Sequence, residues 1–262
     1  MSNRHICIPK ATLLRFAKNG SLRYLNLGTG EIRSSSPNSF MTADDYYSPE
    51  VEKLLADKVE SIMGRLYKKV EDARREKEIL SETVQDLSNL AKEIVFVQSM
   101  RNPSYVIKKV LPYAPSLPQG EDGAKTLANS ILTQATYDYF CNMFCTTIGF
   151  NSYRAMTVIN DTDRAFILPT MHHYQFKVPD EARDRKNWFV IVMDPKLAWV
   201  LIDENDYNRD YRDGSGEVFL RVTQPELVEA MNYVAVAFER ECGAGRIVST
   251  FEELQYFIGR NP

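Results

Sequence analysis

Three histidines and one arginine are the side chains of this sequence best suited to acid–base chemistry. The histidines are His5, His172 and His173, and Arg15 follows His5 across a predicted strand-to-helix turn. Imidazole titrates near neutral pH and binds metals, whereas guanidinium is a permanent cation that suits an anionic group such as phosphate. We therefore predict a catalytic site made of these four residues. Its cofactor stays unidentified, although a divalent metal ion is compatible with the imidazoles.

Each of the four residues also has an ordinary structural interpretation. His172 and His173 are adjacent in a predicted extended segment, where neighbouring side chains point to opposite faces. They cannot share one metal ion unless the backbone turns between them. His5, close to Pro9, fits a hydrogen bond to the chain, and Arg15 fits an ion pair with a carboxylate.

The overall composition is that of a globular protein without a membrane segment. The chain has 262 residues, of which 44% are hydrophobic, and its 32 basic and 35 acidic residues give a net charge of −3. This balance does not indicate nucleic-acid binding, which would need a local basic patch. No apolar run approaches the roughly 20 residues of a membrane span, and the N-terminus lacks the apolar core of a secretory signal. We predict a cytoplasmic location.

The four cysteines agree with that location. Cys7, Cys141, Cys145 and Cys242 lie in apolar patterns, and the middle two are four positions apart on one face of a predicted helix. Free thiols behave as small buried hydrophobes, and reduced cysteines are typical of the cytoplasm. The alternative, a metal-binding pair, would need further ligands elsewhere in the chain.

Apolar periodicity divides the chain into three predicted regions. Residues 1–47 alternate short strands with one helix over Ala11–Ala17 and form a mixed subdomain. Residues 48–110 have helical periodicity and form a hairpin of long helices that begins at Ser48. Residues 124–262 contain a long helix followed by a strand-rich region, and we expect them to form one compact unit with residues 1–47.

The strand-rich region closes with two predicted helices. Thr223 with Glu226, and Thr250 with Glu253, match the capping box in which a hydroxyl and a carboxylate satisfy free N–H groups. The apolar runs before these helices are nearly continuous, which is typical of strands buried on both faces. The predicted fold class is α+β, with a mixed N-terminal subdomain, a long helical hairpin, and a C-terminal, largely antiparallel sheet packed on helices.

The N-terminal residues resemble a known family. Proteins of the bacterial family called domain of unknown function 4238 typically open His-His-Tyr-Val-Pro-Gln-Phe-Tyr-Leu-Arg-Arg-Phe. In matching register this chain has, in order, His5, Pro9, Leu13, Arg15 and Phe16. The segments Met193–Ala198 and Asn232–Ser249 are also similar to the family. The resemblance implies that the chain forms one folded unit and leaves the activity unnamed.

One departure from the family pattern bears on chemistry. The family usually carries Phe-Ile-Thr-Ser-Asp-Asn-Pro after the first hairpin of the strand-rich region. Here Phe166 and Ile167 are followed by Leu168, Pro169 and Thr170, so the Asp is missing. If that Asp is catalytic in the family, this chain has lost or moved the activity.

Two classes of function follow, and the sequence leaves open whether the protein is an enzyme. The first is a defence or toxin effector, such as a metal-assisted nuclease or other hydrolase, that uses His5, Arg15 and His172 or His173. The second is a non-enzymatic protein-interaction or regulatory module. Its docking surface would be the charged run Lys68–Glu78, which would also serve a homo-oligomer formed through the helical region.

Overall fold

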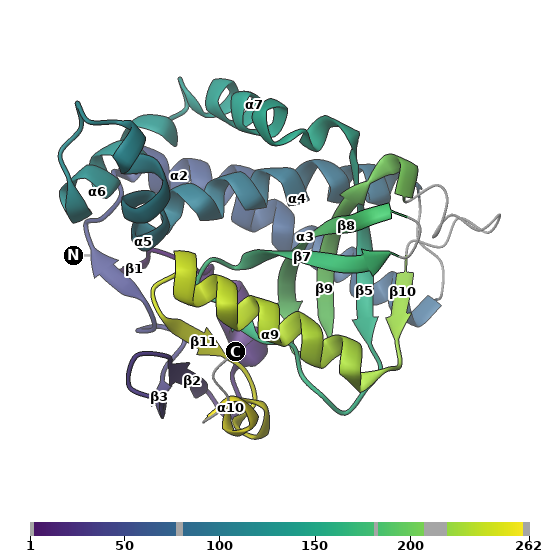
Figure 1. The fold of residues 1–262 in the computed structure, drawn as a ribbon. Coiled ribbons are helices and arrows are strands. Elements are labelled where there is room, and N and C mark those ends of the chain that lie inside the picture. The colour runs from purple at the N-terminus through teal and green to yellow at the C-terminus, as the bar shows by residue number, and fades with distance from the viewer. Residues whose placement is uncertain (1–2, 77–80, 181–182, 207–218, 259–262) are drawn as a thin grey trace.

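A five-stranded sheet lies at the centre of the molecule, between two layers of helices and shorter segments (Figure 1). The computed structural model describes residues 3–76, 81–180, 183–206 and 219–258. The strands pair in the order β10-β5-β9-β8-β7, and only β10 and β5 are parallel. Their bounds are Tyr153–Asn160 for β5, His173–Asp180 for β7, Arg183–Asp194 for β8, Leu197–Asp203 for β9 and Phe219–Val222 for β10. The predicted, largely antiparallel sheet is confirmed.

Both faces of this sheet are buried, as the continuous apolar runs predict. In β9, Leu197, Trp199 and Leu201 pack against the helical layer. The alternate residues Ala198, Val200 and Ile202 pack against the opposite layer. Because successive strand side chains point to opposite faces, a strand without polar residues needs cover on both sides.

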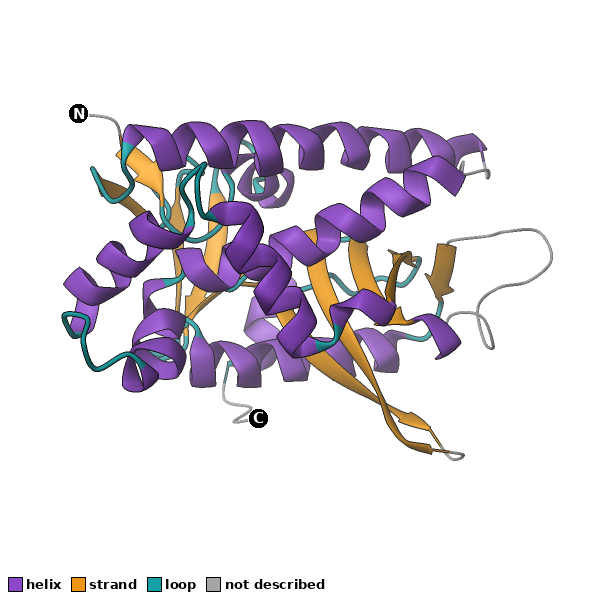
Figure 2. Cartoon of the chain, turned by 90° about the horizontal axis from the view of Figure 1, so that it is seen from above, coloured by secondary structure: helices purple, strands orange, loops and turns teal. Residues whose placement is uncertain are grey.

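The first covering layer is helical and contains the predicted hairpin. Ser48 caps its first helix, since the Ser48 hydroxyl accepts a hydrogen bond from the Val51 N–H at 3.3 Å. The helices run without a break from Pro49 to Glu76, and α4 returns beside them (Figure 2). The elements are α2 (Pro49–Leu54), the π-helical η1 (Leu55–Glu60), α3 (Ser61–Glu76), α4 (Ser81–Arg101), α5 (Pro103–Tyr105), the π-helical η2 (Val106–Val110), the 3₁₀ turn η3 (Leu111–Tyr113), α6 (Gly120–Ile131), α7 (Tyr137–Ile148) and the 3₁₀ turn η4 (Phe150–Ser152).

The second layer joins the two ends of the chain. Strand β11 lies between β2 and β6 in a four-stranded sheet of order β3-β2-β11-β6, and β1 pairs with β4. Helix α9 packs on the central sheet from this side (Figure 1). The elements are β1 (Asn3–His5), α1 (Lys10–Phe16), β2 (Leu22–Asn26), β3 (Glu31–Ser35), β4 (Thr42–Asp44), β6 (Leu168–Pro169), α9 (Pro225–Cys242), β11 (Arg246–Val248) and α10 (Phe251–Phe257).

Three local predictions need correction. The single long helix expected after residue 124 is broken, because the Thr136 hydroxyl donates to the carbonyls of Ser130 and Ile131 and ends α6. Thr223 does not cap α9, which starts at Pro225 after Gln224 and has no side-chain cap. Thr250 does cap α10, but the carboxylate of Glu253 does not complete the box and bonds elsewhere.

The prediction of free, buried cysteines is confirmed, whereas the docking role of the charged run stays a prediction. The four cysteines are free and buried. The charged run Lys68–Glu78 continues α3 as far as Glu76, and its side chains from Arg74 onward lie outside the described residues. Among the helices that the structure describes, none is both long and apolar enough to cross a bilayer.

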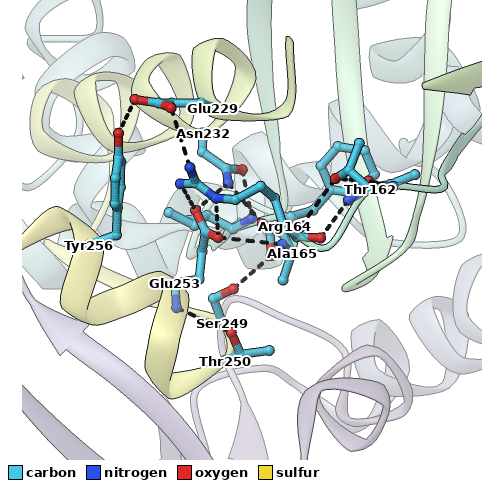
Figure 3. Close-up of polar contacts among 12 residues, drawn as sticks. Thr162, Arg164, Ala165, Glu229, Asn232, Ser249, Thr250, Glu253 and Tyr256 are labelled. Carbon is cyan, nitrogen blue, oxygen red and sulfur yellow. Dashed lines mark hydrogen bonds and ion pairs between the residues drawn. The ribbon is translucent and has the colours of Figure 1, made fainter. Parts of the chain in front are cut away.

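An ion-pair network fastens the loop between β5 and β6 to the C-terminal helices (Figure 3). The Arg164 guanidinium donates twice to the Glu253 carboxylate, at 2.8 and 2.6 Å, and once to Glu229 at 3.3 Å. Asn232 on α9 donates to the same Glu253 at 3.0 Å and to the carbonyl of Ala165 at 2.8 Å. The Glu253 side chain is only 4% exposed, so its charge depends on Arg164.

Replacing Arg164 should therefore cost considerable stability. In Arg164→Met the Glu253 carboxylate stays buried without its cation, which we expect to lower the free energy of unfolding by about 3 kcal/mol. Arg221→Met is the matched control, because Arg221 pairs with Asp161 where the side chains are 49% and 31% exposed. It should cost less than about 1 kcal/mol. Urea unfolding of both variants measures the difference, and equal losses would contradict the buried network.

Candidate functional site

His5 lines a cleft of about 600 Å³ between the N-terminal segment and the helix formed by α2 and η1. We call this the His5 cleft, and its other polar residues are Lys10, Asn38, Tyr47, Glu52, Glu60 and Arg101. The His5 Nδ1 lies 3.0 Å from the carbonyl oxygen of Phe40. Burial lowers the pKa of His5, and the nearby cations Arg101 and Lys10 lower it further.

Arg15 is held away from this cleft, on the last turn of α1. Its guanidinium stacks on the ring of Tyr67, 3.3 Å from the centroid. The Tyr67 hydroxyl in turn donates to Asp194 Oδ2 at 2.7 Å. Burial lowers the pKa of Arg15, and the neighbouring Tyr67 and Asp194 oppose that shift. Arg15 is thus a stacked cation that lines neither of the two cavities described in this section.

His172 is fully buried in a strained backbone conformation. Its φ of 62° lies in the left-handed region, which is uncommon for a residue with a side chain. Its Nε2 lies 3.1 Å from the Val192 carbonyl and donates to it, and its Nδ1 is buried without a partner. Burial lowers the pKa of His172 to about 3, with further lowering by His173 and Arg15. The imidazole is therefore neutral at physiological pH.

His173 begins β7 and lines a second cavity. Its Nε2 lies 3.4 Å from the Ser99 hydroxyl oxygen, and both side chains are almost fully buried. The Ser99 hydroxyl donates to the Val95 carbonyl at 2.8 Å, so its oxygen can accept a hydrogen bond from His173. Burial lowers the pKa of His173 to about 4, opposed by the carbonyl of Met171.

This second cavity, the aromatic pocket, has a volume of about 600 Å³ and lies beside β7, the edge strand of the central sheet. Helices α4, α5, α7 and α9, the π-helical η2 and the strands β5 and β8 supply its other lining residues. Two of its rings, Tyr153 and Phe189, meet edge to face at 5.9 Å. The lining aromatic residues are Tyr105, Phe144, Tyr153, Phe189 and Phe238, and the polar ones include Ser99, Lys109, Thr147, His173 and Gln175.

The four predicted site residues therefore do not meet in one cavity. His5 lines the His5 cleft and His173 lines the aromatic pocket, and the two cavities share no lining residue. His172 is fully buried and Arg15 is partly buried, close enough to His172 to lower its pKa. Their catalytic role stays a prediction. Within the described ranges, no three His, Cys, Asp or Glu side chains are grouped closely enough to hold a metal ion.

Sequence reasoning missed a buried carboxylate on α9. Glu239 is fully buried and accepts hydrogen bonds from the Thr170 N–H at 2.8 Å, the Thr170 hydroxyl at 2.6 Å and the Arg246 N–H at 3.1 Å. Burial raises the pKa of Glu239 to about 7, and these hydrogen bonds oppose the shift. Helix α9 ends beside it at Gly243, where a Cβ atom would overlap the Glu239 carboxylate.

The comparison with protein families settles the relationship suggested by the N-terminal residues. The family model described as a protein of unknown function, DUF4238, matches residues 4–238. The chain belongs to the DUF4238 family. The match includes the helical middle of the chain and stops within α9, so most of the similar segment Asn232–Ser249 lies beyond it. No curated protein and no solved structure matches the chain.

The departure from the DUF4238 pattern can now be placed in the structure. Counted from Phe166, the position of the usual Asp is occupied by Thr170, the residue that donates twice to Glu239. An Asp at this position would set a second carboxylate against a buried one, which is unfavourable unless one of them is protonated. Threonine instead supplies a donor, so in this member the position is part of a hydrogen-bonded junction between β6 and α9.

The buried imidazole of His173 predicts a pH dependence of stability. In the unfolded chain the imidazole titrates near pH 6.5, whereas its pKa in the folded protein is about 4. Below pH 6.5 the unfolded state binds the extra proton, so this contribution is complete above pH 6.5 and is lost as the pH falls toward 4. Between pH 6 and 4.5 the wild type should lose about 1.2 kcal/mol per pH unit more than His173→Gln.

Urea unfolding at several pH values measures this difference. All other titratable groups are common to the two proteins, so the difference between their slopes reports His173 together with the smaller effect that His173 has on the pKa of His172. Parallel curves would contradict the neutral, buried imidazole.

Proposed function

We propose that this DUF4238 protein is a regulatory module that binds a planar aromatic anion in the aromatic pocket. The observation that carries the proposal is the convergence of five aromatic side chains around the buried Ser99–His173 pair. Small-molecule sites are typically concave, mainly apolar cavities of this size with a few fixed polar groups. The proposal develops the non-enzymatic alternative that the sequence leaves open.

The rings of the pocket favour a flat, apolar body in the ligand. Phe189 also meets Phe150 edge to face at 4.6 Å, and Phe144 lies 5.4 Å from Phe96, so the lining rings are fixed by core aromatics behind them. Rings held in this way lose little conformational entropy when a ligand stacks on them. A planar aromatic group is therefore the best complement to this wall.

The polar groups at the base of the pocket favour a hydrogen bond over an ion pair. His173 is neutral at pH 7 because burial lowers its pKa to about 4. A neutral imidazole donates from one ring nitrogen and accepts at the other. Together with the Ser99 hydroxyl, it can orient a polar substituent on the ring of the ligand.

Lys109 supplies the charge that an anionic ligand needs. Its ammonium group pairs with Glu241 at 2.5 Å, and the two side chains are 39% and 65% exposed. An exposed pair of this kind is worth little, so a ligand anion can compete with Glu241 for the ammonium group. The next residue back, Lys108, bonds to the Gly243 carbonyl and does not line the pocket.

Filling the pocket should weaken binding without harming the fold. Thr147 and Thr146 are adjacent exposed residues near the end of α7, and only Thr147 lines the pocket. Thr147→Trp should weaken binding of the planar aromatic anion anilinonaphthalene sulfonate at least tenfold, whereas Thr146→Trp should leave it unchanged. Fluorescence titration of the full chain measures the affinities.

A second pair of variants tests the charge. Lys109→Met should weaken binding of the same dye, and Lys108→Met should not. The proposal fails if the wild type shows no saturable binding, or if both tryptophan variants weaken it equally.

The second candidate is a hydrolase, with Ser99 as nucleophile and His173 as base. The contact of 3.4 Å between their Oγ and Nε2 atoms favours it, because a neighbouring imidazole can activate a hydroxyl. This role requires the Ser99 hydroxyl to turn its hydrogen from the Val95 carbonyl toward His173 Nε2. We rank it second because a base with a pKa of about 4 is weak at pH 7. If it is correct, the wild type cleaves nitrophenyl acetate and Ser99→Ala slows that reaction at least a hundredfold. Equal rates of cleavage by the wild type and Ser99→Ala would exclude the hydrolase and leave ligand binding as the proposed function.

A further inference from the structure

Glu239 is a buried carboxylate that the proposed function does not use, although it lies beside the aromatic pocket. It is fully buried on α9, and both its neighbour Phe238 and Cys242, one turn further on, line that pocket. The centroid of the Phe238 ring lies 6.1 Å from that of the His173 ring. A change at Glu239 can therefore reach the pocket through the last turn of a single helix.

The Glu239 carboxylate is surrounded by hydrogen-bond donors. Its Oε1 accepts from the Thr170 hydroxyl at 2.6 Å and from the Arg246 N–H at 3.1 Å, and its Oε2 accepts from the Thr170 N–H at 2.8 Å. The Thr170 hydroxyl oxygen in turn accepts from the Ala244 N–H at 3.0 Å and from the Asn102 side-chain amide at 3.3 Å. A hydroxyl has one hydrogen and two lone pairs, so Thr170 cannot accept a further hydrogen bond. A proton on Glu239 finds no acceptor among these groups, and one of the donors has to move.

Within the described ranges, no cation forms an ion pair with Glu239. The Arg246 guanidinium turns away and donates to the Met41 sulfur at 3.0 Å. An anion buried without a paired cation is poorly stabilised, so burial raises the pKa of Glu239 to about 7. The other charged and titratable groups around it are the thiols on which Glu239 acts electrostatically, Cys7 and Cys242, and the charges that act on the same thiols, Arg101, Lys108, Lys109, Glu241 and Arg246.

The turn formed by residues 243–246 is folded around this carboxylate. A Cβ atom at Gly243 would lie 2.2 Å from the Glu239 carboxyl carbon, so only glycine fits there while the carboxylate keeps its place. The Lys108 ammonium group donates to the Gly243 carbonyl at 3.3 Å, and the next residue, Lys109, lines the aromatic pocket. The turn thus connects Glu239 to two parts of the pocket lining, the end of α9 and η2.

We infer that Glu239 makes ligand binding in the aromatic pocket depend on pH. While Glu239 is ionised, the turn stays closed on the carboxylate, and the end of α9 keeps the position that forms the pocket. Protonation sets a new hydrogen against the donors of Thr170 and Arg246, so the turn moves away and the pocket loses a fixed wall. The inference rests on the proposed function, because the affinity that changes is that of the same pocket.

The groups that line the pocket leave the range from about pH 6 to pH 8 clear for this effect. The sulfonate of anilinonaphthalene sulfonate is ionised throughout this range. The titratable lining residues change charge outside it, since burial lowers the pKa of His173 to about 4 and raises the pKa of Tyr105, Tyr153 and Cys242, and Glu241 raises the pKa of Lys109. A change in dye affinity within this range therefore reports on Glu239.

Fluorescence titration of the full chain with this dye, at several pH values from 6 to 8, tests the inference. The wild type should bind about fivefold more tightly at pH 8 than at pH 6. Glu239→Gln, which places a donor there at every pH, should bind weakly at both values. The matched control is Glu226→Gln, an exposed carboxylate at the start of α9, which should keep the wild-type response. Equal wild-type affinities at the two pH values, or a response that survives in Glu239→Gln, would overturn the inference.

Thr170→Val keeps the test decisive if Glu239→Gln does not fold. It removes one donor to the ionised carboxylate, so the midpoint of the pH profile should move upward by about one pH unit. An unchanged midpoint would overturn the inference.

Hydrogen exchange at the Ala244 and Arg246 amides follows the turn without any ligand. After correction for the intrinsic effect of pH on exchange, both amides should be less protected at pH 6 than at pH 8. Unchanged protection would overturn the inference. Saturable dye binding of equal strength at both pH values would refute only the pH dependence, whereas no saturable binding at either pH would refute the proposed function and this inference with it.

Discussion

The architecture depends on the burial of the central sheet on both faces. The residues from Leu197 to Ile202 in β9 are fully buried, and so are the residues from Val190 to Met193 in β8. Strands of this kind are stable only when both faces are covered. The helical hairpin covers one face, and α9 with the N-terminal segment covers the other. The two cavities lie at the margins of these covering layers. The aromatic pocket is beside β7, one of the two edge strands, and the His5 cleft is between the N-terminal segment and α2.

Buried polar groups then fix how the covering layers sit on the sheet. Asn232 and Glu239 occur on the apolar face of α9, among Val228, Met231, Ala235, Val236 and Cys242. Asn232 bonds to the loop before β6, and Glu239 bonds to Thr170 and to the start of β11. Without such polar groups, an apolar helix face could shift along the sheet at little cost in free energy. Hydrogen bonds that must all be made at once permit one position only.

Most helices and strands of this fold could be predicted from the sequence, because each is indicated by a pattern of neighbouring residues. The period of the apolar residues indicates the helices after Ser48, and the apolar runs indicate β5, β7, β8 and β9. The break between α6 and α7 was not readable, since it depends on where the Thr136 hydroxyl bonds. Asn232 and Glu239 did leave a signal, as two polar residues at helical spacing within an apolar stripe.

The cavities could not be predicted in the same way. The aromatic pocket takes its lining from residues between Val95 and Cys242, on helices and strands that meet only in the folded chain. His5, Arg15, His172 and His173 were grouped by chemical type, and nothing local shows that α1 turns Arg15 toward Tyr67 on α3. Arg101 was overlooked because a charged residue at the end of a helix is usually solvent-exposed. Here it is buried against His5 and Glu60.

The position of β11 has a consequence for how the chain is made. Strand β11 pairs with β2 on one side and β6 on the other, and its residue Val248 lies opposite Tyr24. During synthesis, β2 and β3 leave the ribosome long before β11 exists, so β2 presents an open edge to other chains for most of translation. Contacts between such distant segments form slowly, and an open strand edge invites intermolecular pairing. The growing chain thus carries an aggregation hazard that ends only when its last strand docks.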